Sequence, residues 1–489
     1  MTISPVSPIA TNPSHAYMRP STPVFRHIDD GEDPSLMEPE VLYEEVMNCG
    51  VPLLAAIEAQ ARGYQYGSPI GATAKAIATA ACDAPKAAVL TGIGGRPAPL
   101  NFLFCFVAPS GIGKGLSLDA KMATAHPMNG YRRLTPASGE ALIASFFDSV
   151  PAADGKGSET IRHDEPVWGH WGEIDQLAAK AGNSNATLDA TVRSLWSGEK
   201  AGDVSITRMK AGLGTQLDPD SYRFVLTVGG QTDHLAIILH DETGGTLQRY
   251  LFVPILDDEA PATMGDIMGY RHTLNSILGL PHEAQPLLAP TISVWGPRAG
   301  VTVTEDVIKF LILYRAQILR SERSVDPLDT HENNLRVRLA SVFAGWVAGE
   351  GNPAVVNREA WWWAGCFMAL SRSLREECRK LAVAKKTETA RDAGELDADR
   401  ADARKEAEKR IHINRVLAAQ DTVLRAVCRW AERDPRGGTA RDIRSITAAT
   451  KRDYVDEALE FMLDNNTILA NQDGNSKRYL PNPKYAHNA

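Results

Sequence analysis

A lysine that follows a glycine-bearing loop is the residue of this chain best suited to bind phosphate. The loop comes after an apolar run, Phe102 to Val107, which is too short for a helix and is predicted to be a buried strand. A segment compatible with a helix follows the lysine, over residues 115–124. Small residues let backbone N–H groups turn toward phosphate oxygens, and a helix N-terminus adds partial positive charge. The residues predicted to surround the phosphates of ATP are Ala108, Ser110, Gly111, Gly113, Lys114 and Gly115.

Two positions of this loop depart from the usual phosphate-binding pattern. Ala108 stands where such loops commonly have Gly, and Gly115 stands where Ser or Thr usually binds magnesium. The hydroxyls of Ser110 and Ser117 lie nearby, but at other positions. The alternative interpretation is a glycine turn without a ligand, and the strand before the loop and the helix after it favour the nucleotide site.

Two carboxylates follow a second short apolar stretch, which lies between Glu165 and Asp175. In a phosphate-loop ATPase one carboxylate holds the magnesium shell and another orients the attacking water. We expect Glu173 to be the main catalytic carboxylate and Asp175 to be the second. Both are expected to act through a bound magnesium ion. The alternative is a surface Glu and a helix N-cap Asp, since Asp is common at N-caps.

Two further polar residues are associated with apolar strands. Gln231 ends the predicted strand that begins near Ser221, where it is placed to sense a terminal phosphate; a turn or capping role is equally compatible with the spacing. Arg249 lies in the apolar run Thr246 to Val253. Because an unpaired guanidinium is costly to bury, Arg249 must either pair with a carboxylate such as Asp241 or Glu242 or reach a surface.

Composition limits the class of protein. The 489 residues have 44% hydrophobic and 23% charged content and a net charge of −8, so contact with DNA requires a local basic patch. The six cysteines form no CxxC pair and are predicted to be free thiols. We expect a cytoplasmic protein without membrane contact, since the sequence shows neither a signal peptide nor a long apolar span.

Strands that alternate with helices predict an α/β fold with a mostly parallel sheet. A charged stretch after residue 374 is expected to be a solvated helix, partly broken at Gly394, or a flexible linker. The three adjacent tryptophans that begin at Trp361 are expected to pack in the core rather than to stack on bases. The predicted divisions are a disordered tail (1–39), N-terminal helices (40–85), a phosphate-loop ATPase core (86–300), a helical region (301–385), a charged helix or linker (386–412) and a C-terminal domain (413–489).

The C-terminal domain has a pattern of three helices and a hairpin, which predicts a winged helix-turn-helix. Lys451 and Arg452 open its third helix, and Lys477 and Arg478 lie in the predicted wing. These are positions from which basic side chains reach DNA phosphates or bases. Acidic residues in the same helix leave a protein-binding module of the same shape as the alternative.

Residues 68–382 resemble a family of P-loop ATPases of unknown function encoded by phages and integrative elements, some of them fused to or neighbouring primase-polymerase domains. The matching pieces are SPIGATAKAIATA, LNFLFCFVAPSGIGKG, TPASGEAL, GEIDQLAAKAG, LWSGEKAGDVSITR, TVGGQTDHLAIIL, GGTLQRYLFVP and DPLDTHENNLRVRLASVFAGW. In that family Gly after the loop lysine is a tolerated variant. The resemblance implies a RecA-like core, with Lys114 as the phosphate ligand, Glu173 as the Walker B acid, Gln231 as the sensor and Arg249 as an arginine finger.

The expected function is therefore that of an ATP- and magnesium-dependent protein of a prophage or mobile element that acts on DNA. A replicative helicase or translocase, assembled as a homo-oligomer and possibly a ring, is the leading hypothesis. The first alternative is a non-motor DNA-binding initiator or regulator that uses ATP only as an assembly switch. The second is a small-molecule kinase, suggested by the Lys-Gly step after the loop and opposed by the C-terminal domain.

Overall fold

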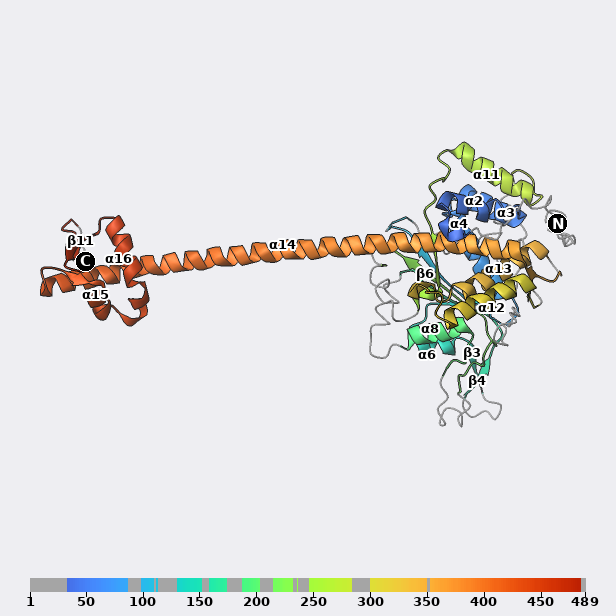
Figure 1. Ribbon diagram of the computed structural model, residues 1–489, viewed down its shortest axis with the longest axis horizontal. Coiled ribbons are helices and arrows are strands. Elements are labelled where there is room, and N and C mark those ends of the chain that lie inside the picture. Colours follow the sequence, from blue (N-terminus) through green and yellow to red (C-terminus); the bar gives the residue numbers. More distant parts are fainter. Residues whose placement is uncertain are drawn as a thin grey trace, which may run out of the picture. The chain divides into compact units, whose positions relative to one another are not determined.

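The computed structural model describes residues 33–484, apart from 87–97, 110, 113–129, 152–157, 174–186, 203–213, 232–234, 236–245, 284–299 and 350–351. The chain divides into two compact units, residues 1–385 and 386–489 (Figure 1). The first unit contains the central sheet. Its first described residues form a short 3-10 helix, η1 (Pro34–Leu36), which lies inside the predicted tail of residues 1–39.

A five-stranded parallel sheet is the centre of the first unit. Its strands are β1 (Phe102–Val107), β2 (Arg132–Leu134), β5 (Val167–Trp171), β6 (Phe224–Gly230) and β7 (Tyr250–Pro254). They are ordered β2-β5-β6-β1-β7, and each neighbouring pair is parallel. Every residue of β1 and β6 is buried, which explains why β1 is a continuous apolar run and why β6 is apolar apart from Thr227. The predicted α/β fold with a parallel sheet is confirmed.

The order of the strands determines where the loops meet. After β1 the chain moves to the far edge at β2, returns through β5 to β6, and then crosses β1 to add β7 on its other side. Because all five strands are parallel, the segments that leave β1, β5 and β6 all start at the same, carboxyl edge of the sheet. This topology is compatible with a Rossmann or RecA-like core, in which ligands bind at that edge.

Among the described residues before the sheet, three α-helices follow η1. The apolar spacing over residues 40–61 belongs to two helices, α2 (Pro39–Met47) and α3 (Pro52–Gly63). Pro52 begins α3, since proline lacks the N–H that would continue a preceding helix. The third helix, α4 (Pro69–Asp83), lies within the predicted region of N-terminal helices (40–85) and is almost wholly buried.

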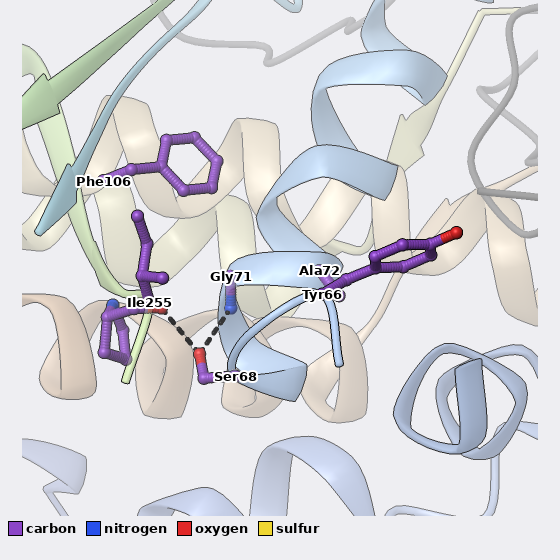
Figure 2. A pocket seen from close by; sticks show the side chains of 7 residues that line it. Tyr66, Ser68, Gly71, Ala72, Phe106 and Ile255 are labelled. Carbon is purple, nitrogen blue, oxygen red and sulfur yellow. Dashed lines mark hydrogen bonds between the residues drawn. The ribbon is translucent and has the colours of Figure 1, made fainter. Parts of the chain in front are cut away.

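The N-terminus of α4 is fastened to the end of β7 by one serine (Figure 2). The Ser68 hydroxyl donates to the Pro254 carbonyl oxygen (2.6 Å) and accepts from the Gly71 N–H (3.0 Å). The Ser68 N–H also donates to the Ile255 carbonyl oxygen (2.9 Å). The cavity beside these groups has a volume of about 10 Å³, which is room for one water molecule at most. This contact is therefore a structural anchor and not a ligand pocket.

The remaining elements of the first unit include helices that pack on the sheet and helices that pack on other helices. The helix α6 (Gly139–Ala144) ends before Phe147, which begins β3 (Phe147–Pro151), and β3 pairs with β4 (Ser158–Arg162). The other elements are α8 (Leu188–Ser197), α11 (Met264–Ile277), β8 (Thr302–Val303), α12 (Glu305–Leu319), η4 (Pro327–Asp329), α13 (Glu332–Ala348) and β9 (Val355–Val356).

The three tryptophans lie at the start of a very long helix, α14 (Arg358–Arg433). The Trp363 ring stacks on Phe343 and Phe367, and its indole N–H donates to the Val46 carbonyl oxygen. Trp362 donates to the Glu45 carboxylate. The expectation that these rings pack between helices is thus confirmed.

The charged stretch is an unbroken part of α14, so the predicted break at Gly394 is wrong. Residues 387–415 are exposed all round the helix. A helix without a buried face depends on its own side-chain pairs, and pairs such as Arg391–Glu395 and Arg404–Glu408 have the required i,i+4 spacing. The solvated helix, rather than the flexible linker, is the form that the structure has.

The second unit has its own core, which includes residues at the end of α14 (Val416, Ala419, Val423, Ala426 and Val427), and further elements follow that helix. They are β10 (Gly438–Thr439), α15 (Ala440–Ile446), η5 (Ala449–Tyr454), α16 (Val455–Asp464), β11 (Ile468–Asp473) and β12 (Ser476–Pro481). The predicted third helix is therefore a 3-10 turn followed by α16. The predicted hairpin is present, with a turn of only two residues, Gly474 and Asn475, and β10 adds a third antiparallel strand.

A helix that crosses a membrane must be both long and apolar. Across the part of the chain that the structure describes, the helices include none with the length and apolar character needed to span a bilayer.

We predict that Gly71→Ala destabilises the first unit, by about 1–3 kcal/mol, as overpacked sites do. A Cβ at Gly71 would lie 2.8 Å from the Pro254 carbonyl oxygen, a backbone atom that cannot move freely. The matched control is Gly394→Ala, also within a helix, where a Cβ meets nothing within 4 Å. Thermal unfolding followed by circular dichroism should show a lower midpoint for Gly71→Ala alone. Equal midpoints for the two variants would contradict the tight anchor.

Candidate functional site

Two residues predicted from separate stretches meet at the carboxyl edge of the sheet. Glu173 follows β5 and Gln231 follows β6, and the Gln231 side-chain Nε2 donates to the Glu173 Oε2 at 2.9 Å. Both side chains are half-buried. The hydrogen bond holds one carboxylate oxygen of Glu173 in a defined direction. The structure therefore brings these two residues together, while their chemical roles remain predictions.

The glycine-bearing loop starts at the same edge, directly after β1. The Ala108 N–H donates to the Gly230 carbonyl oxygen (3.0 Å), which connects the start of the loop to the residue before Gln231. Gly111 has a φ of +84°, a conformation that a side chain would strain. Ser110, Gly113, Lys114 and Gly115 lie outside the described residues.

A carboxylate in this position has two possible uses in phosphate chemistry. It can accept a proton from an attacking water, or it can contact the hydration shell of a magnesium ion. Among the residues that the structure describes, no group of three or more His, Cys, Asp or Glu side chains could hold a metal by itself. Magnesium bound with a nucleotide needs only one or two carboxylates, because phosphates and waters supply its other ligands. Glu173 fits that requirement, and Asp175 lies in an undescribed segment.

Sequence reasoning missed three residues on the strands behind this pair. The Thr227 hydroxyl oxygen lies 3.1 Å from the Trp168 indole Nε1 and 3.0 Å from the His170 Nδ1. Thr227 and Trp168 are buried and His170 is half-buried. The available signal was a threonine inside an otherwise apolar strand, a position where a hydroxyl needs a partner.

Arg249 lies at the other end of the sheet. It belongs to a 3-10 helix, η2 (Leu247–Arg249), and β7 begins at the next residue, so the prediction that Arg249 lies within the strand is wrong. In a parallel sheet the amino end of β7 faces away from the carboxyl edge. Arg249 therefore does not reach the Glu173 of its own chain. The acids considered as its partners, Asp241 and Glu242, lie outside the described residues.

Arg249 belongs to a group of cationic side chains around Trp196. The Arg249 Cζ lies 5.1 Å from the centre of the Trp196 ring, and the Cζ of the buried Arg338 lies 4.0 Å from it. Arg338 also donates to the carbonyl oxygens of Asn101 and Trp196. His331 contacts the edge of the same ring. The two arginines thus bring positive charge to the amino edge, and the carboxylates of Asp189, Glu199 and Asp220 are near enough to act on them.

The pKa values of this cluster are lowered by burial and by mutual repulsion. Burial, with Arg249 nearby, lowers the pKa of Arg338 to about 9. Burial and both arginines lower the pKa of His331 to about 4, so that this imidazole is neutral at neutral pH. Burial and then Arg193 lower the pKa of Arg249 itself. An anion brought to Arg249 from outside the chain would favour its charged form.

The four basic residues predicted to contact DNA divide into two kinds. Arg478 pairs with Asp434 and Asp473 and donates to the Gly437 carbonyl oxygen, so it holds the turn before α15. Arg452 donates to the Thr447 carbonyl oxygen. Lys477 is exposed and Lys451 is half-buried.

The exposed face of α16 is acidic. Asp456, Glu457, Glu460 and Asp464 are all exposed along it. Arg444 pairs with Asp456, and His412 lies within hydrogen-bond distance of Glu457. The third helix of the C-terminal unit therefore presents more negative than positive charge.

No model of a known protein family matches this chain, and no curated protein matches it at a significant level. The residues at the carboxyl edge, at the amino edge and in the C-terminal unit are therefore the basis on which a function can be proposed.

Proposed function

We propose that this protein binds and hydrolyses ATP at the carboxyl edge of its parallel sheet. The observation that carries the proposal is the hydrogen bond between Glu173 and Gln231, which lie at the ends of adjacent strands. The other neighbour of β6 is β1, which leads directly into the glycine-bearing loop. A phosphate loop, a carboxylate and a polar amide on three neighbouring strands are the parts that ATP hydrolysis requires.

Each residue has one role in this proposal. The loop, with Lys114, binds the phosphates. Glu173 accepts the proton of the attacking water, and Gln231 holds that carboxylate and contacts the terminal phosphate. Magnesium, held through Glu173 and Asp175, would neutralise charge on the phosphates.

We further propose that ATP turnover acts on DNA, in the replication of a prophage or mobile element. The resemblance of residues 68–382 to a phage ATPase family and the three helices and small sheet of the second unit, in the manner of a winged helix, support this. A helicase or translocase assembled from several copies in the cytoplasm is the leading version.

The acidic face of α16 favours the alternative, an assembly switch whose second unit binds protein. Stimulation of ATP turnover by single-stranded DNA distinguishes them, because a switch needs ATP binding but little turnover.

We predict that Lys114→Ala weakens ATP binding about ten- to a hundredfold, since a charge-assisted contact contributes roughly 1.5–3 kcal/mol. Glu173→Gln should retain ATP binding and lose hydrolysis, because an amide cannot accept the proton. Calorimetric titration and phosphate release measure the two effects separately. Unaltered ATP affinity in Lys114→Ala would refute the nucleotide site. Normal turnover in Glu173→Gln would transfer the catalytic role to Asp175 or another acid.

We predict that Arg249 serves the active site of a neighbouring copy, because it lies at the opposite edge from Glu173 of its own chain. Arg249→Ala and Lys114→Ala should each be nearly inactive alone. Mixed in one assembly, some interfaces combine an intact loop with an intact arginine, and ATPase activity should partly return. An absence of recovery in mixtures shown to co-assemble would mean that Arg249 acts within its own chain or only supports the fold.

We predict that Lys451→Glu with Lys477→Glu weakens duplex DNA binding without unfolding the second unit. The slope of log affinity against log salt should fall by about two, roughly one for each phosphate contact. Arg478→Ala is the comparison. It should lower stability by about 1–2 kcal/mol through its lost pairs and retain the salt slope of the parent. DNA affinity that is unchanged in the lysine variant would locate the DNA contact elsewhere or favour a protein partner.

A further inference from the structure

Side chains as well as backbone connect β5 to β6 beneath the Glu173–Gln231 pair. Thr227 and His170 are direct partners in the register of the two strands. The Thr227 hydroxyl lies between the Trp168 Nε1 (3.1 Å) and the His170 Nδ1 (3.0 Å). Only Trp171 and Gly172 separate His170 from Glu173, and three residues separate Thr227 from Gln231. The Thr227 hydroxyl of β6 thus contacts two side chains of β5, and these two strands lead to Gln231 and Glu173.

The chemistry of these groups orients the hydroxyl. An indole N–H can only donate, so the Thr227 oxygen accepts from Trp168. The hydroxyl hydrogen is then available to donate to the Nδ1 of a neutral His170. Loss of this hydroxyl would leave a buried indole N–H without its acceptor, which forces local rearrangement. Nothing in the proposed roles of Glu173 and Gln231 accounts for such a bridge.

We infer that Thr227 is a positioning residue for ATP hydrolysis, which it supports by holding the ends of β5 and β6 at the separation that joins Gln231 to Glu173. This inference depends on the proposed ATPase function. The backbone ladder sets the spacing of the two strands, while the bridge limits their sliding and twisting near the carboxyl edge. A displacement of the carboxylate by a fraction of its hydrogen-bond length is enough to slow a proton transfer that requires contact with water.

The test uses three substitutions in the full chain. Thr227→Val keeps the shape of the side chain and removes the hydroxyl, and kcat for ATP should fall about ten- to a hundredfold while KM is unchanged. Thr227→Ser restores the hydroxyl and should recover most of the parental kcat. Thr79→Val is the matched control, because Thr79 is equally buried but donates only within α4, to the Lys75 carbonyl oxygen. It should retain the parental kcat.

Two further measurements distinguish a positioning role of Thr227 from a merely structural one. In a Gln231→Ala background, Thr227→Val should cause little additional loss of kcat, since it acts through the pair already broken. If Thr227→Val does not fold, Trp168→Phe removes the indole donor together with part of the ring, and it should lower kcat in the same direction. A parental kcat in the folded bridge variants, or losses that add fully in the double variant, would overturn the inference. A parent protein with no ATP turnover would instead refute the proposed function on which the inference depends.

Discussion

The pairing of β1 with β6 on one side and β7 on the other is the interaction on which the first unit depends. A strand with two parallel neighbours has its backbone groups paired on both sides, and both of its faces must be covered by other elements. The all-apolar run FLFCFV satisfies that requirement, and α4 packs against the same three strands. The end of β1 is thereby held beside the end of β6, where the Ala108 N–H donates to the carbonyl oxygen of Gly230, the residue before Gln231.

The elements with strong local signals were predictable from the sequence. β1, β5 and β6 occur where their apolar runs predict them, and α3 and α4 lie within the predicted region of N-terminal helices (40–85). The wrong predictions concern Arg249 and Gly394, where neighbouring side chains decide the local structure. Arg249 is one residue short of β7, because the buried Trp196 ring packs its guanidinium outside the strand. Gly394 does not break α14, since one glycine costs a helix only about 1 kcal/mol and the neighbouring ion pairs oppose that cost.

Part of the candidate site was also predictable, because it depends on apolar runs with strong local signals. Glu173 and Gln231 each end an apolar run, and parallel strands bring such ends together. The Thr227 bridge was not predictable, because it depends on the register of two strands separated by more than fifty residues of sequence. The charges of the C-terminal unit were also misjudged from the sequence. Arg478 is a wing residue by position, but two aspartates from different segments engage it.

The position of β1 also has a consequence for the order in which the chain folds. Asn101, just before β1, accepts a hydrogen bond from the backbone of Phe224, 123 residues later in the chain. At a synthesis rate of 5–20 residues per second, β1 leaves the ribosome on the order of 6–25 s before β6 can pair with it. During that interval an uncharged segment of high β-propensity has no native partner, which is the property of aggregation-prone sequences. The strand that supports the candidate site is thus also the segment of this sheet that most needs protection while the protein is being made.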